Sequence, residues 1–228
     1  LEKKQDEKNV RRQFCYYTQF SSSLVSNIIP QAGTKRFLMP LVNYLYNPIY
    51  TKAQLYNVLK PIINHDISYF DVSKAYDRAL EFKESCSMKL REIYKREADS
   101  ADNIHVVFIG RPYSILPASM NSVIPAIFAS QGMNALYQDM LSYTHKDVES
   151  IEPLCNELPW YYASEILKAA EVVAQSDRAY PVFVTSFNCS PDSFAVEYFK
   201  KLMESHEKPY LILQLDEHSS SVGYETRI

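Results

Sequence analysis

The stretch His105-Val-Val-Phe-Ile-Gly110 decides the fold of this chain. A run of apolar residues that ends at a glycine is typical of a strand buried on both faces of a parallel sheet. Similar runs follow along the chain, and segments with the 3.6-residue spacing of a helix separate them. The pattern predicts further strands over 133–138, 181–186 and 210–215, and helices over 120–131, 160–174 and 191–205.

Alternation of strands and helices favours a parallel sheet, because the crossover between two parallel strands runs over a face of the sheet. We therefore predict an α/β fold for residues 103–228, with a Rossmann-like or flavodoxin-like parallel four-stranded sheet and flanking helices. A more helical and irregular N-terminal part, residues 1–102, precedes it. This part is expected to complete a second α/β lobe or to pack on the first.

The N-terminal part gives weaker signals. The charged residues 1–12 predict a solvated lead-in, and prolines divide residues 14–50 into short pieces. Thr51-Lys-Ala-Gln54 has the pattern of a capping box that opens a short helix. Ser68-Tyr-Phe-Asp71 is a similar start signal for a long helix that runs to about Glu97.

Composition excludes several classes of protein. The 228 residues are 46% hydrophobic, which provides enough material for a core. A net charge of −3 gives no electrostatic reason to bind nucleic acid, and no apolar run is long enough to span a membrane. The hydrophilic start lacks the apolar stretch of a signal peptide, and the cysteines are widely spaced. We predict a cytoplasmic protein that binds neither nucleic acid nor membrane.

Polar residues follow each predicted strand. Ligands of open parallel sheets bind outside the carboxyl ends of the strands, so these residues are expected to line one crevice. The candidate crevice residues are Arg111, Tyr113, Asp139, Asp192, Ser193, Asp216, Glu217 and His218.

Cys189, in the loop after the strand predicted over 181–186, has the most distinctive chemistry of the residues near these strand ends. If Ser190 is an N-cap and Pro191 the first helical residue, the thiol lies just before a helix N-terminus. The partial positive charge there stabilises a thiolate, the form that binds metals or attacks electrophiles. The alternative is a well-capped loop between a strand and a helix.

Arg111 and the Asp216-Glu217-His218 segment each allow two interpretations. Arg111 can hold a phosphate or carboxylate with two hydrogen bonds, or it can form an ion pair with Asp139 or Asp216. The segment can provide acid–base or metal chemistry, or it can be an ordinary polar loop.

Several of these loops together resemble a known family. They are Gly110-Arg-Pro-Tyr113, Phe187-Asn-Cys-Ser-Pro-Asp-Ser-Phe194, Lys208-Pro-Tyr-Leu and the segment from Asp216 to Arg227. They are similar to the 2-hydroxyacyl-CoA dehydratase activator-related proteins, often called CoA-substrate-specific enzyme activases. In that family this region is a domain of unknown function. Ser190 stands where the family usually has glycine.

This resemblance implies a relative of iron–sulfur dehydratase subunits. It implies that Cys189 and Cys15 are metal ligands of a [4Fe–4S] cluster in the full-length protein, completed by at least one ligand upstream. The partners that it implies are an ATP-binding activase module, in the same or another chain, and a CoA-ester dehydratase. The chain itself has no nucleotide motif, because it contains neither G-x-G-x-x-G nor a Walker loop.

Three functions are compatible with these residues, and they leave open whether the chain is an enzyme. The first is an accessory or electron-transfer module that contributes to an iron–sulfur site. The second is a binding or scaffold domain that has lost the cluster. The third is a thiol enzyme in which Cys189 is the nucleophile and His218 the base.

Overall fold

The chain divides into two compact units, Leu1–Cys86 and Ser87–Ile228. The domain boundary expected between residues 102 and 103 lies outside the described residues. A computed structural model describes residues 3–5, 11–29, 37–42, 47–63, 66–98, 104–186, 189–216 and 222–228.

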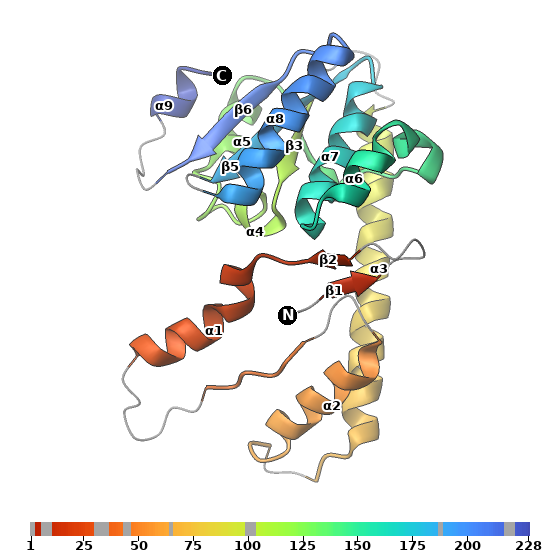
Figure 1. The fold of residues 1–228 in the computed structure, drawn as a ribbon, viewed down its shortest axis with the longest axis vertical. Helices are drawn as coiled ribbons and strands as arrows, with labels where there is room; N and C mark the ends of the chain where they lie inside the picture. Colours follow the sequence, from red (N-terminus) through yellow and green to blue (C-terminus); the bar gives the residue numbers. More distant parts are fainter. Residues whose placement is uncertain are drawn as a thin grey trace. The chain divides into compact units, whose positions relative to one another are not determined.

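The second unit is built on a four-stranded sheet in the order β4-β3-β5-β6, and every neighbouring pair is parallel (Figure 1). The predicted α/β fold, with a parallel four-stranded sheet and flanking helices, is confirmed. All six residues of the central strand β3 are buried, as expected of a strand covered on both faces. The strands are β3 (His105–Gly110), β4 (Asn134–Tyr137), β5 (Ala179–Ser186) and β6 (Leu211–Leu215).

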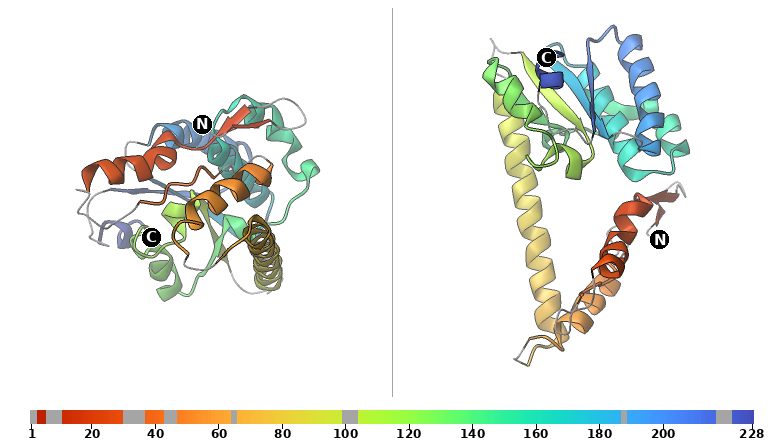
Figure 2. Two further views of the ribbon diagram at one scale, coloured as in Figure 1. Left: turned by 90° about the horizontal axis from the view of Figure 1, so that it is seen from below. Right: turned by 90° about the vertical axis from the view of Figure 1, so that its left-hand side faces the viewer.

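Helices cover both faces of this sheet (Figure 2), and an apolar core lies on each face. Alternate residues of β3 enter them, so that Val107 belongs to the core under α7 and α8 and Phe108 to the core under α4 and α5. The helices of this unit after α3 (Tyr69–Ala98) are α4 (Pro112–Ile115), α5 (Ile124–Ser130), α6 (Glu152–Glu157), α7 (Tyr161–Ala174), α8 (Ser190–Ser205) and α9 (Val222–Glu225), with 3-10 helices η1 (Gln138–Met140) and η2 (His145–Ile151).

The helix predicted over 120–131 is shorter than expected and begins at Ile124. Ser122 and Val123 have φ values of 49° and 58°, and this left-handed backbone cannot belong to a right-handed helix. Gly132, with a φ of 79°, follows the end of the helix, where glycine commonly adopts the left-handed backbone that ends a helix.

The first unit differs more from the prediction. Within the lead-in expected over residues 1–12, strand pairing was not predicted: β1 (Lys3–Gln5) and β2 (Arg11–Gln13) pair in an antiparallel manner. The expectation of short irregular pieces after residue 14 is wrong for α1 (Tyr16–Ile28), a helix of 13 residues. This segment contains no proline, so nothing in its backbone interrupts the helix.

Of the two helix starts predicted in the first unit, the one at Thr51 lies inside a helix and the one at Ser68 is confirmed. Helix α2 (Pro48–Leu59) begins before Thr51, since the Asn47 side chain accepts a hydrogen bond from the Ile49 N–H at 3.0 Å and caps it. The start signal at Ser68 is confirmed for α3 (Tyr69–Ala98), where Asp71 and Ser68 exchange side-chain hydrogen bonds with each other's backbone N–H.

Candidate functional site

A buried ion pair joins the carboxyl ends of the two central strands. The connection from β3 to β4 runs over one face of the sheet and the connection from β4 to β5 over the other, which is the arrangement that opens a crevice. Arg111 directly follows β3, and Asp192 lies in the first turn of α8, after β5. The Arg111 Nε and Asp192 Oδ1 atoms are 2.7 Å apart.

This pair is held by further hydrogen bonds and is removed from solvent. Arg111 is 4% exposed and Asp192 is 1% exposed. Arg111 Nη1 donates to the Tyr113 hydroxyl at 2.6 Å, and the Thr185 hydroxyl donates to Asp192 Oδ2 at 3.1 Å. Burial opposes the charge on Arg111, but Asp192 and Tyr113 outweigh it and the pKa of Arg111 is raised. The guanidinium is therefore charged.

Arg111 forms an ion pair, as one of its two interpretations expected, but not with either of the carboxylates that the sequence suggested. Its partner is Asp192, and it pairs with neither Asp139 nor Asp216. Asp216 follows β6, which β5 separates from β3. Asp139 lies in η1 with an exposed side chain, whereas the first turn of α8 puts Asp192 beside the end of β3.

Cys189 lies at the N-terminus of α8, but as the N-cap itself in place of the expected Ser190. Its carbonyl accepts hydrogen bonds from the N–H and the hydroxyl of Ser193, at 2.9 and 3.0 Å. Burial raises the pKa of the half-buried thiol, and Asp192 raises it further. The Asp192 N–H and Arg111 act in the opposite direction without outweighing them, so the thiolate expected at this helix end is disfavoured.

The other predicted residues are distributed as follows. Tyr113 and Ser193 lie with Arg111, Asp192 and Cys189 at the ends of β3 and β5. Asp139 lines a separate cavity, and Asp216 is exposed after β6. Glu217 and His218 lie outside the described residues. Cys15 is the half-buried N-cap residue of α1, in the first unit.

The donor set around Cys189 is sparse. Within the described ranges, no group of three or more His, Cys, Asp or Glu side chains could hold a metal ion. Cys155 belongs to the core, since it is fully buried with its sulfur 3.8 Å from the Ser164 carbonyl oxygen. Cys189 is thus the thiol that accompanies the Arg111–Asp192 pair.

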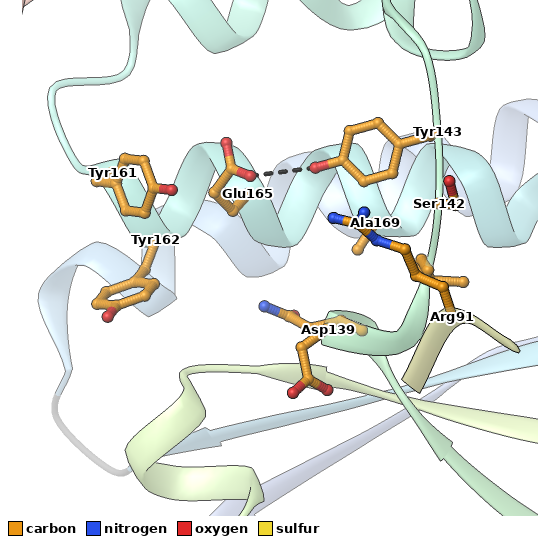
Figure 3. Close-up of a pocket in the computed structure, with 10 residues that line it drawn as sticks. Arg91, Asp139, Ser142, Tyr143, Tyr161, Tyr162, Glu165 and Ala169 are labelled. Carbon is orange, nitrogen blue, oxygen red and sulfur yellow. Dashed lines mark hydrogen bonds between the residues drawn. The ribbon is translucent and has the colours of Figure 1, made fainter. Parts of the chain in front are cut away.

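A polar cavity of about 380 Å³ lies beside the end of β4 (Figure 3). The Tyr143 hydroxyl donates to Glu165 Oε2 at 3.1 Å along one wall, and burial raises the pKa of Tyr143. The Tyr162 ring packs edge-on against the Tyr113 ring, with 6.0 Å between centroids, and so connects the cavity with the crevice. Sequence reasoning singled out Asp139 and missed the tyrosines, although 18 tyrosines in the chain are an excess that signals such surfaces.

No helix within the described ranges is both long enough and apolar enough to cross a bilayer.

Comparison with known proteins identifies the family. No match was found among curated proteins or solved structures. The family described as the CoA enzyme activase uncharacterised domain matches residues 1–141, which include Cys15 and Arg111 but not Cys189. Because the match spans more than half of the sequence, the chain belongs to the CoA enzyme activase uncharacterised domain family.

Proposed function

We propose that this chain is an accessory domain of a CoA enzyme activase and that Cys189 supplies a thiolate ligand to an iron–sulfur site. The observation that carries the proposal is the half-exposed Cys189 thiol at the N-terminus of α8, next to the Arg111–Asp192 pair. Family membership supports a partnership with a CoA-dependent enzyme. The partners that we propose are an ATP-binding activase module and a CoA-ester dehydratase, in the cytoplasm.

The chemistry of Cys189 is compatible with a cluster, which would contribute electron transfer when bound. Iron–sulfur clusters are held by cysteine thiolates, and the N–H groups of a helix N-terminus favour negative charge. Because the pKa of the Cys189 thiol is raised, binding would release a proton and weaken as the pH falls. The described residues offer no set of three ligands at Cys189, so the proposed [4Fe–4S] cluster needs further ligands, and the family resemblance suggests Cys15 as one of them.

Iron analysis of the full chain tests this proposal. The protein is purified without oxygen, and iron, acid-labile sulfide and the visible absorption spectrum are measured. Cys189→Ala and Cys15→Ala should each lower the iron content, whereas Cys86→Ala, at another half-buried thiol, should not. Iron-free wild-type protein, or iron that persists in both variants, would overturn the cluster proposal.

A second candidate is a binding domain without a cluster. The raised pKa of Cys189 and the lack of a three-ligand group in the described ranges favour it. It predicts iron-free protein that binds the activase module or the dehydratase equally well with and without Cys189→Ala. A thiol enzyme is less well supported, because the raised pKa reduces the thiolate fraction on which nucleophilic attack depends.

A further inference from the structure

Helix α1 of the first unit presents an apolar stripe to solvent, and no function proposed above uses it. The stripe consists of four large residues at the three- and four-residue spacing of one helix face, Tyr17, Phe20, Leu24 and Ile28. Their exposed fractions are 82%, 52%, 51% and 76%, and α1 buries none of its side chains. Because a stripe of this kind normally faces a core, its exposure indicates a surface that another molecule covers.

Charge is absent from this part of the sequence. Residues 14–34 contain no Asp, Glu, Lys or Arg, although 22% of the whole chain is charged. A surface that docks a transient partner is about as polar as the rest of a protein, whereas the interfaces of permanent homodimers are more apolar. The composition of α1 therefore favours a permanent interface.

A surface without charge is also able to pack against a copy of itself. In a two-fold symmetric dimer the same patch of both subunits forms the interface, so charged residues near the axis meet like charges and repel each other. The apolar stripe of α1 would meet only apolar side chains in such a dimer. No second surface is needed, since the stripe is its own complement.

The exposed area on α1 is sufficient for a stable dimer. Burying the stripe in both copies, with the exposed Tyr16, Val25 and Ile29 beside it, would remove roughly 1,000–1,500 Å² from water. Specific interfaces between proteins bury about 1,000 Å² or more in total. The stripe and its neighbours thus reach the size that a specific interface requires.

A membrane surface matches α1 less well than a second copy does. Helices that lie on a membrane carry Lys or Arg on the polar face, where these residues attract anionic lipids. The polar face of α1 consists of uncharged residues such as Thr18 and Ser22. Electrostatic attraction to anionic lipid is therefore missing from this helix.

We infer that the chain forms a two-fold symmetric dimer in which the apolar stripes of two α1 helices pack against each other. A two-fold axis perpendicular to the helix, through the middle of the stripe, makes the two helices antiparallel and sets Phe20 opposite Leu24 of the other copy. The inference is independent of the iron–sulfur proposal, because no residue of the stripe is a proposed ligand.

Analytical ultracentrifugation of the full chain tests the inference. Wild-type protein should sediment at the mass of two chains. Leu24→Glu should raise the dissociation constant of the dimer about a hundredfold or more, because the interface would then bury two unpaired carboxylates. The control Ser22→Glu adds the same charge on the opposite, exposed face of α1 and should leave the dimer intact. Circular dichroism checks that each variant keeps its helices.

A mixture of two variants tests the symmetric contact itself. Phe20→Lys and Leu24→Glu should each dimerise weakly alone and should form a heterodimer when mixed, since the new charges then face each other. A wild-type chain that is monomeric at about 100 µM would overturn the inference. So would a dimer that Leu24→Glu does not weaken, or a mixture that stays monomeric. Wild-type protein that is monomeric yet cosediments with phosphatidylglycerol vesicles would also overturn it and would indicate a membrane surface.

Discussion

Replacing Asp192 by alanine should destabilise the second unit strongly. The change removes the acceptor of the Arg111 Nε–H and of the Thr185 hydroxyl and leaves a guanidinium that is 4% exposed without a counterion. Breaking a buried ion pair from one side costs about 3–5 kcal/mol, because the remaining charge keeps its desolvation penalty. At about 2–4 °C per kcal/mol, the melting temperature should fall by roughly 6–20 °C.

Scanning calorimetry of wild-type protein and Asp192→Ala measures this fall, with Glu197→Ala as the matched control. Glu197 forms an ion pair with Lys200 at 2.8 Å, nearly the distance of the buried pair, but on the surface of α8. Its loss should leave the melting temperature almost unchanged, since solvent screens exposed pairs.

A double variant tests whether the loss of stability comes from the charge that Asp192→Ala leaves unpaired. Arg111→Met combined with Asp192→Leu removes both charges, so it should cost less than Asp192→Ala alone. The reasoning is refuted if Asp192→Ala lowers the melting temperature no more than Glu197→Ala does.

Three further changes have predicted effects on the free energy of unfolding, each measured by urea denaturation. Gly110→Ala should destabilise by about 1–3 kcal/mol, because its Cβ would meet the Val184 carbonyl oxygen at 2.6 Å; unchanged stability would contradict this close approach. Val123→Asn should stabilise by about 1 kcal/mol, because an exposed β-branched residue with a φ of 58° gives way to one that tolerates the left-handed region. Glu171→Ala should cost about 1–3 kcal/mol, since this buried carboxylate bonds His206 at 3.1 Å and two other side chains; a neutral result would show that the network is dispensable.

Hydrophobic patterning was sufficient to predict the sheet but not the first unit. Every predicted strand of the second unit is present, because buried runs such as 105–110 leave few alternatives in a chain of this composition. Helix α1 was missed although Tyr17, Phe20, Leu24 and Ile28 recur at helical spacing, and the structure leaves all four side chains exposed. The paired strands β1 and β2 consist of charged and amide residues, which predict a solvated segment equally well.

The sequence was sufficient to predict where the candidate site lies, but not that Arg111 forms its ion pair with Asp192. Strand order places the residues after β3 and β5 together, and the sequence pattern alone indicated those loops. The carboxylate that pairs with Arg111 is determined by the packing of the first turn of α8. The spacing of residues along the chain does not predict this packing. The pKa of Cys189 was expected to fall with the helix N-terminus, yet burial and the neighbouring Asp192 carboxylate prevail.

The central claim is that the Cys189 thiol faces the Arg111–Asp192 pair, and the pH dependence of its alkylation tests this most directly. A raised pKa means that the folded state holds the proton, so alkylation of Cys189 should accelerate only at higher pH than for an unperturbed cysteine. Peptide mass spectrometry follows this residue alone. Asp192→Asn keeps the backbone N–H and Arg111 but removes the carboxylate charge, so the midpoint should move to lower pH, while Asp147→Asn on η2 leaves it in place. Equal midpoints in wild-type protein and Asp192→Asn would contradict the claim.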